Sequence, residues 1–238
     1  MTQRVGYIKG ISENPAIIVA PHGNDDTNTD LLVETIQNEL QISSVINYGW
    51  ERSKHFDYYK DKANCNSISH VHEDVIKQEF LDPILTSYDF SLNTGYLPAL
   101  FIIHGVHDSI RNTPNATNLD LIIGTGYSNR KSCDDWSKHF FCKMLTSKNF
   151  NVFLGKENGQ YAGNSNDNLN QILNHYKNKY AISERCSFQI EVVKSLRDNK
   201  QKTIESAKRL ADSINAFMLL KNDTLNQFSI MYIDYPTI

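Results

Sequence analysis

The chain has 238 residues, of which 40% are hydrophobic, and its 24 Lys and Arg residues nearly balance 27 Asp and Glu residues, for a formal net charge of -3. A chain of this length and composition can bury a sizeable core and is not of the disordered class. The small acidic excess argues against nucleic acid as a partner. No signal-peptide pattern and no membrane-spanning apolar run occurs, so we expect a cytoplasmic protein with no membrane partner.

Short β-branched runs alternate with longer amphipathic segments along the whole chain. The apolar runs predict strands at residues 16–20, 44–48, 100–104, 119–123, 151–154, 188–193 and 228–233. The segments between them predict helices at about 29–40, 71–85, 134–145, 168–180 and 203–219. This alternation predicts an α/β fold with three layers, in which helices cover both faces of a mixed, mostly parallel sheet. No linker divides the chain, so we expect a single domain over residues 1–238.

The helix predicted at 29–40 has the clearest start signal. Thr29 is suited to cap it, and Asp30 is favourably placed in the first turn.

Two of the predicted strands lead into the same pair of residues, His-Gly. The first leads through Pro21 to His22 and Gly23, and the second leads to His104 and Gly105. Ligands of open α/β sheets bind at the carboxyl ends of the strands. A lone histidine at a strand end is more often a hydrogen-bonded structural residue, but two such ends indicate a functional site.

Two carboxylates, Asp25 and Asp26, follow the first of these strand ends. Imidazole nitrogens and carboxylate oxygens are zinc ligands, and a catalytic zinc site combines three protein ligands with a position for water. His22, His104 and one aspartate can supply such a set. Spacing alone does not choose between Asp25 and the competing ligand Asp26.

A single carboxylate, Glu191, interrupts the apolar run 188–193. Within hydrogen-bond reach of a zinc-activated water, Glu191 can take the proton and return it to a leaving amine. The competing interpretation is a solvent-facing side chain on an edge strand, paired with Lys194 or Arg197.

Two other patterns favour different chemistry more weakly. Gly124-Thr125-Gly126 follows a strand, as a phosphate-binding loop does, but neither GxGxxG nor a Walker lysine accompanies it. Cys65 is a candidate nucleophile near His70, although a loop cysteine without an oriented base is usually unreactive.

At the strand-end residues the sequence resembles the N-formylglutamate amidohydrolase family, a group of zinc-dependent deformylases with a metallocarboxypeptidase-like fold. The resemblance spans roughly residues 14–217, and its motifs occur in the family's order. They are Pro21-His22-Gly23, Ile103-His104-Gly105, Asp120 to Thr125, and Gln189-Ile190-Glu191.

This resemblance implies a phosphorylase/hydrolase-like fold and a zinc cofactor. It implies that His22, His104 and Asp25 hold the metal and that Glu191 is the catalytic acid and base. Asp120 would support the site, and Tyr161, in a loop resembling one near the family's substrate pocket, would line that pocket.

One departure from the family concerns the substrate. Where the family has Val-Asp-Leu-Asn-Arg, this chain retains the asparagine as Asn66 but has Ser67 in place of the arginine. Serine supplies neither the charge nor the fork of a bidentate carboxylate clamp. We therefore expect Asn66 to bind substrate and Arg111, Arg130 or Arg185 to compensate from another loop.

Taken together, these features predict a zinc-dependent amidohydrolase acting on a small-molecule amide, with N-formylglutamate as the default substrate. A peptide or γ-glutamyl amide is the near alternative. A catalytically inactive metal- or ligand-binding homologue is the alternative from another class. The sequence leaves open whether the chain forms a homo-oligomer.

Overall fold

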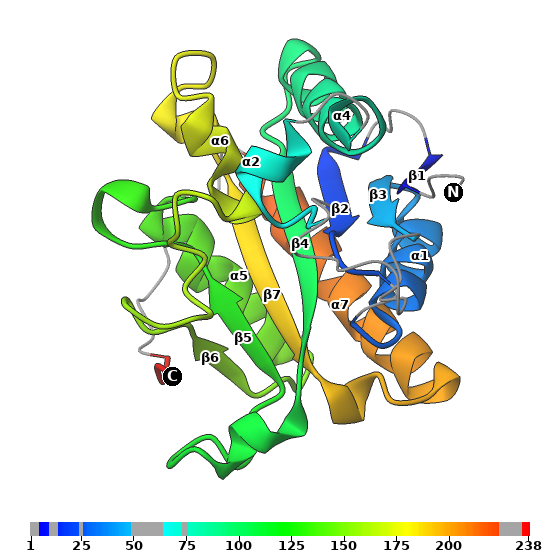
Figure 1. Ribbon diagram of the computed structural model, residues 1–238, viewed down its shortest axis with the longest axis vertical. Coiled ribbons are helices and arrows are strands. Elements are labelled where there is room, and N and C mark those ends of the chain that lie inside the picture. The colour runs from blue at the N-terminus through cyan, green and yellow to red at the C-terminus, as the bar shows by residue number, and fades with distance from the viewer. Residues whose placement is uncertain (1–4, 10–13, 24–25, 49–63, 73–75, 224–234) are drawn as a thin grey trace.

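The computed structural model describes residues 5–9, 14–23, 26–48, 64–72, 76–223 and 235–238, and within these ranges seven strands form one sheet (Figure 1). The order across the sheet is β1-β3-β2-β4-β7-β5-β6. The pairs β1–β3 and β5–β7 are antiparallel, and the other pairs are parallel. The predicted mixed, mostly parallel sheet is therefore confirmed. The strands are β1 (Val5–Lys9), β2 (Ala16–Ala20), β3 (Ser43–Asn47), β4 (Ala99–Val106), β5 (Leu121–Gly124), β6 (Val152–Leu154) and β7 (Ser187–Val193).

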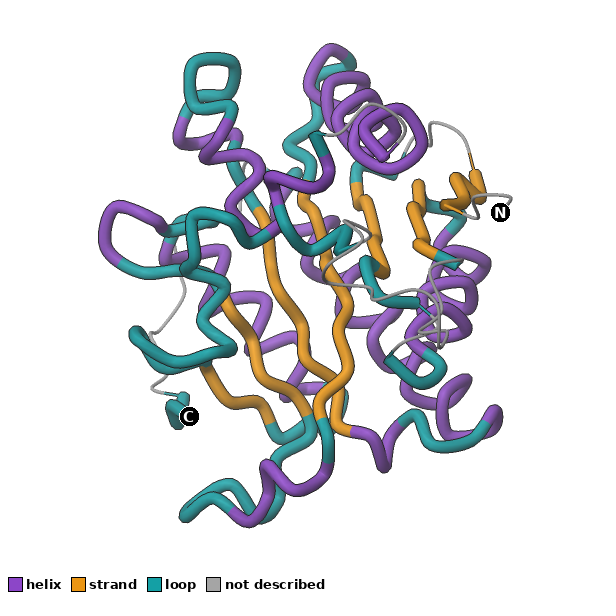
Figure 2. The backbone as a smooth tube through the Cα atoms, in the orientation of Figure 1, coloured by secondary structure: helices purple, strands orange, loops and turns teal. Residues whose placement is uncertain are grey.

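Helices cover both faces of the sheet, as the three-layer prediction requires (Figures 1 and 2). One face carries α1 (Thr29–Leu40), α5 (Asp135–Ser147) and α7 (Lys200–Lys221). The other carries α2 (Ile68–Val71), α4 (Asp82–Asn93) and α6 (Ile172–His175), with a π-helical turn, η1 (Lys77–Leu81), leading into α4. Among the described helices, none combines the length and apolar character that crossing a bilayer requires.

Alternate residues of the central strands divide between the two cores. Ile18 and Phe101 pack into the core under α1, α5 and α7, whereas Ile17 and Leu100 pack into the core under α2, α4 and α6. This alternation follows from the two-residue repeat of a strand. It also fixes the face to which each polar residue of the same strands points.

Most predicted elements are confirmed with small shifts in their ends. The strand predicted at 44–48 is Ser43–Asn47, and the helix predicted at 29–40 is Thr29–Leu40. β1 was not predicted, and the strand predicted at 228–233 lies outside the described residues. The helix predicted at 71–85 is described only in parts, as the end of α2, then η1 and the start of α4.

The helix predicted at 168–180 is wrong. The segment instead forms a 3-10 turn, η4 (Leu169–Gln171), followed by the single turn of α6. The side chain of Asn168 accepts the backbone N–H of Asn170, and the Asn170 amide donates to Ser132 Oγ and Gly124 O. Asparagine side chains that bond locally or across to the sheet compete with a continuous helix.

The start of α1 also differs from the prediction. Asn28 is the N-cap, with φ 61°, and Thr29 is the first helical residue. The Thr29 hydroxyl donates to the backbone oxygens of Gly23 and Asp26, at 3.2 and 3.0 Å. Thr29 therefore ties the turn after β2 to the start of α1, which positions Asp26.

Residues 235–238 lie along β6, at the edge of the sheet. The Leu154 N–H donates to Pro236 O at 2.8 Å, and the Ile238 N–H donates to Leu154 O at 2.9 Å. Pairing of this kind covers backbone groups that an edge strand leaves open.

Candidate active site

The strands β4 and β7 place His104 and Glu191 side by side. The two residues are register partners in the parallel pair, and both point to the face that α2, α4 and α6 cover, because the alternating residues of both strands point to the opposite face. His104 is 4% exposed and Glu191 is 6% exposed. Burial of ionisable groups is costly unless they are paired or have a function.

His22 joins this pair from the turn after β2. Its ring centroid lies 5.1 Å from that of His104, with the two planes inclined at 54°. The Asp26 N–H donates to His22 O at 2.8 Å, which closes the turn. The two predicted His-Gly ends therefore meet, as expected for carboxyl ends of neighbouring parallel strands.

Asp26 lies on one side of the His104 ring. Its Oδ2 accepts the Gly105 N–H at 2.9 Å and lies 3.8 Å from His104 Nδ1. On the other side of the ring, His104 Nε2 is buried and has no hydrogen-bond partner in the described part of the chain. A carboxylate near one ring nitrogen and an open second nitrogen are typical of a metal-ligating histidine.

The charge state of His104 also suits a ligand. Burial lowers the pKa of His104 well below its ordinary value, and the neighbouring His22 lowers it further. His104 is therefore neutral near pH 7, and a neutral imidazole nitrogen is the form that binds a metal.

Glu191 has the opposite shift. Burial, with a smaller contribution from Asp26, raises its pKa to about 8, against the opposing effects of the hydrogen bond from Gln189 and the charge of Arg197. Gln189 Nε2 donates to Glu191 Oε1 at 2.8 Å. A carboxyl group with a pKa near neutrality can both accept and return a proton.

These groups line one cavity of about 380 Å³. The cavity brings together five predicted site residues, His22, His104, Glu191, Asn66 and Tyr161. The predicted ligand Asp25 lies outside the described residues, whereas Asp26 lines the cavity. The other lining residues are Asn64, Gly105, Val106, His107, Gln160, Asn168 and Gln189.

Two of the described side chains, His22 and His104, are placed to act as ligands of a divalent metal ion. His22 and His104 converge, and His104 Nε2 is a buried polar atom without a partner. Within the described ranges, however, no group of three His, Cys, Asp or Glu side chains is arranged to hold a metal. A three-ligand site would need a rearrangement of Asp26 or a residue outside those ranges, where Asp25 lies.

Two predicted substrate-binding arginines lie elsewhere. Neither Arg111 nor Arg130 is among the described residues that line this cavity. Arg111 donates to Leu119 O at 2.7 Å and to Asp120 Oδ1 at 3.0 Å, so it stabilises a loop. Asp120 also accepts the side-chain amide of Asn151, and it is not among the lining residues either. Arg130 lines a different cavity.

Ser67 has a structural task at the position of the family's arginine. It is the N-cap of α2, and its hydroxyl donates to Asp167 Oδ2 at 2.6 Å. The adjacent Asn66 lines the cavity, and its Oδ1 is buried without a hydrogen-bond partner in the described part of the chain.

The sequence suggested Arg197 only as an ion-pair partner of Glu191 on an edge strand and did not predict that Arg197 joins the segments of this region. Arg197 is 4% exposed and donates to the backbone oxygens of Val192, Thr27 and Val106. It therefore joins the segments that follow β7, β2 and β4. A Cβ at Gly105 would lie 2.1 Å from Arg197 Nη2. The glycine after His104 was the available signal, because it indicates close approach of another group.

The two weaker chemical interpretations find no support. Cys65 is fully buried, and burial raises the pKa of its thiol far above the ordinary range, so it is not a ready nucleophile. All four cysteines are buried and none forms a disulfide. The backbone of Gly124 to Gly126 packs against neighbouring chain, with the Cβ position of Gly126 1.9 Å from Arg130 O. The Gly126 N–H donates to Ala162 O at 2.8 Å, so this amide is already paired.

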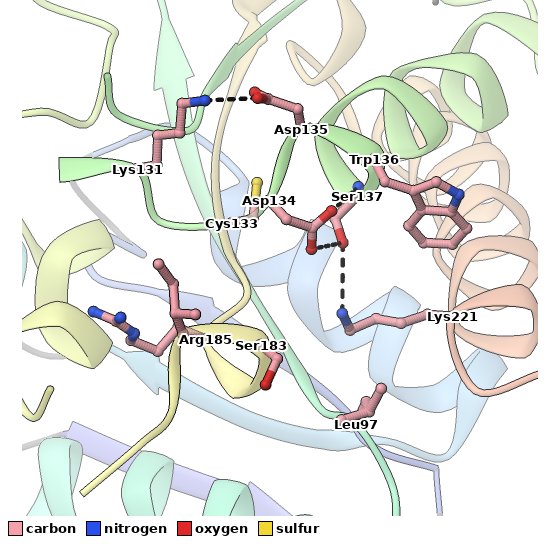
Figure 3. Close-up of a pocket in the computed structure, with 11 residues that line it drawn as sticks. Leu97, Lys131, Cys133, Asp134, Asp135, Trp136, Ser137, Ser183, Arg185 and Lys221 are labelled. Atoms are coloured by element: carbon pink, nitrogen blue, oxygen red, sulfur yellow. Dashed lines mark hydrogen bonds and ion pairs between the residues drawn. The ribbon is translucent and has the colours of Figure 1, made fainter. Parts of the chain in front are cut away.

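A second cavity, of about 620 Å³, lies near the amino ends of β4 and β7 (Figure 3). Its lining includes Leu97, which precedes β4, and Arg185, which precedes β7. Figure 3 shows Lys131 paired with Asp135 and Lys221 directed at Ser137. The predicted catalytic residues are absent from the described lining.

The sequence matches no protein-family model, and no curated protein matches it. The fold does match solved structures. An N-formylglutamate amidohydrolase from Ralstonia eutropha JMP134 has a TM-score of 0.58 at 10% identity, over 90% of this chain and 96% of that chain. A gene product from Agrobacterium tumefaciens has a TM-score of 0.55 at 10% identity, over 92% and 96%. A bacteriophage poly-γ-glutamate hydrolase has a TM-score of 0.50 at 16% identity, over 91% and 92%.

These likenesses establish the class of the protein at the level of fold. The chain has the α/β fold of the N-formylglutamate amidohydrolase and the poly-γ-glutamate hydrolase, over nearly the whole length of each. The resemblance found in the sequence is confirmed to that extent.

Proposed function

We propose that this protein is a metal-dependent hydrolase of amide bonds, with zinc as its metal and a small-molecule amide as its substrate. The observation that carries the proposal is the juxtaposition of His104, with its open Nε2, and Glu191, with its raised pKa, in one cavity. The solved structures of the same fold that are named as amide hydrolases support it.

In this proposal His22 and His104 hold the metal, with Asp25 as the expected third ligand. When bound there, zinc would supply a Lewis acid for the substrate carbonyl and an acidified water. Asp26 holds the Gly105 N–H and faces His104 Nδ1, which fixes the His104 ring with Nε2 directed away from Asp26.

Glu191 is the proton carrier. Its pKa near 8 leaves it able to accept a proton from the attacking water and to donate one to the leaving amine near neutral pH. Gln189, which donates to Glu191 Oε1, restrains the orientation of that carboxyl group.

The substrate amide lies between these groups and the loop residues. Asn66 Oδ1 is a buried acceptor without a partner among the described residues, so it suits a substrate N–H donor. Tyr161 lies close enough for Glu191 to raise the pKa of its phenol, although burial is the larger cause. Tyr161 therefore lines the side of the cavity next to the proton carrier.

A γ-glutamyl or peptide-like amide is the alternative substrate. None of the described residues that line the catalytic cavity is Arg or Lys, and the carboxylates next to the scissile amide of either substrate would require cationic partners when buried.

The test is turnover of zinc-loaded protein on N-formylglutamate and on γ-glutamyl amides, comparing wild type with Glu191→Gln. We expect Glu191→Gln to retain the metal and to lose about 10²- to 10⁴-fold in turnover. Glu205→Gln, which changes an exposed carboxylate on α7, is the matched control. Stoichiometric ligand binding without turnover of any amide would instead identify an inactive homologue.

A further inference from the structure

A cation-rich cavity of about 480 Å³ lies beside the catalytic cavity. Its positively charged members are Arg130 and Arg185, both half-buried, and the exposed Lys177. No Asp or Glu is among the described residues that line it. The remaining lining residues are Asn129, Asn166, Gln171, Asn174 and His175.

The two arginines of this cavity donate to neutral groups. Arg130 Nη1 donates to the backbone oxygen of Asn164, and Arg185 Nη1 donates to Asn174 Oδ1. Arg185 Nε is buried and, within the described part of the chain, has no hydrogen-bond partner. None of the three forms an ion pair with a described carboxylate.

Other basic side chains of the same protein are neutralised. Lys131 pairs with Asp135 at 2.6 Å, and Lys179 pairs with Asp89 at 2.5 Å. Both lysines are sequence neighbours of the cavity's cations, so acidic partners are available nearby. A chain with a formal charge of -3 nevertheless leaves three cations together around one hollow, which is the electrostatic signature of an anion site.

The two cavities share one stretch of chain. Asn168 lines the catalytic cavity and Asn166 lines the cation-rich one. Two residues of extended chain span at most about 7 Å, so the walls of the two cavities are adjacent. An extended molecule that passes along this stretch of chain would contact both cavities.

We propose that the cation-rich cavity binds carboxylates of an extended anionic substrate whose scissile amide lies in the catalytic cavity. The inference rests on the proposed function, since it assigns the two cavities to one substrate. In this arrangement the cations that bind the substrate carboxylates lie in one cavity and the amide that is hydrolysed lies in the other. The substrate class is thus a chain carrying several carboxylates, in contrast to the single residue of N-formylglutamate.

Binding is measured by calorimetry on protein whose metal has been removed by chelation, so that nothing is hydrolysed. The probes are a short glutamate oligomer, in α- and γ-linked forms, and N-formylglutamate. We expect one of the oligomers to bind at least about tenfold more tightly than N-formylglutamate at low ionic strength. Salt should weaken its binding, because the cavity is open to solvent.

The deciding variant is the triple change Arg130→Gln, Lys177→Gln and Arg185→Gln. We expect it to weaken oligomer binding by about a hundredfold or more and to leave the affinity for N-formylglutamate within about twofold. The matched control removes three exposed, ion-paired lysines elsewhere, by Lys148→Gln, Lys202→Gln and Lys208→Gln. It has the same net charge and should bind the oligomer as wild type does.

Three results would overturn the inference. These are oligomer binding no tighter than N-formylglutamate binding, equal losses in the two triple variants, or inorganic phosphate bound as tightly as the oligomer and lost in the same variant. The last result would make the cavity a site for free anions. Failure of the proposed function is seen separately, as absence of turnover while oligomer binding and its dependence on the three cations persist.

Discussion

The catalytic cavity and the cation-rich cavity adjoin the same segment but have opposite chemistry. The first is lined by imidazoles, carboxyl groups and amides, with no Arg or Lys among its described lining residues, and the second by cations and amides, with no described carboxylate. A cation bonded directly to Glu191 would lower its pKa and leave it a permanent anion. Keeping the anchoring charges one cavity away preserves a carboxyl group that titrates near neutral pH.

The largest expected effect distinguishes turnover, which needs the catalytic cavity, from oligomer binding, which needs the cation-rich cavity. His104→Ala should lose bound metal and lower turnover by about a thousandfold or more, while chelated wild type and variant bind the oligomer alike. The core derives from the sheet and helices, so the variant should remain folded. Metal content, turnover and circular dichroism are the measurements, with His139→Ala on α5 as the control. Full metal occupancy in His104→Ala would refute the ligand assignment.

The next effect concerns the pH dependence of stability. In metal-free protein Glu191 has a pKa of about 8, against its ordinary value of 4.5. The folded state therefore holds this proton more tightly than the unfolded state, and stability falls as pH rises from 4.5 to about 8. Glu191→Gln removes this loss and should be more stable than wild type above pH 8, by at most about 5 kcal/mol.

Urea unfolding with chelator present measures this difference at both ends of the range. His104, whose pKa is lowered, destabilises both proteins as pH falls below its ordinary value of 6.5, so its contribution cancels in the comparison. Equal free energies of unfolding for wild type and Glu191→Gln above pH 8 would show that ionisation of Glu191 does not destabilise the folded protein.

A smaller effect concerns the packing of Gly105 against Arg197 next to the catalytic cavity, which the cation-rich cavity does not share. Gly105→Ala places a methyl group against the buried Arg197 guanidinium, which three backbone oxygens hold in place. We expect a loss of about 1–3 kcal/mol, with oligomer binding unchanged. In a double-variant cycle with Arg197→Lys, the two losses should be less than additive, because the changes share one contact. Additive losses of stability would show that Gly105 and Arg197 contribute independently.

The smallest effect belongs to a residue outside both cavities. Arg111→Gln should leave KM for every substrate unchanged within about twofold and cost about 1 kcal/mol of stability, because Arg111 bonds to Leu119 and Asp120. Steady-state kinetics and thermal unfolding check both parts. A tenfold rise in KM would return Arg111 to the substrate site.

Local patterns predicted most of the fold, and their failures have local causes. Apolar runs located β2, β4 and β7 because buried strands must be apolar, and the His-Gly ends located the site because ligands gather at carboxyl ends of strands. The helix predicted at 168–180 failed because Asn168 and Asn170 bond to backbone and sheet. Spacing cannot reveal the bond from the Asn170 amide to Gly124, since that acceptor is distant in sequence.

By itself, the sequence determined the α/β class and singled out His22, His104 and Glu191. Only the tertiary structure decided that Asn66 and Tyr161 line the same cavity as these residues and that Arg111 and Arg130 do not. It also revealed Arg197 behind Gly105. Patterning along a chain fixes which face of an element is buried. Which charges meet depends on strand order and loop packing, and these bring together residues that no local spacing connects.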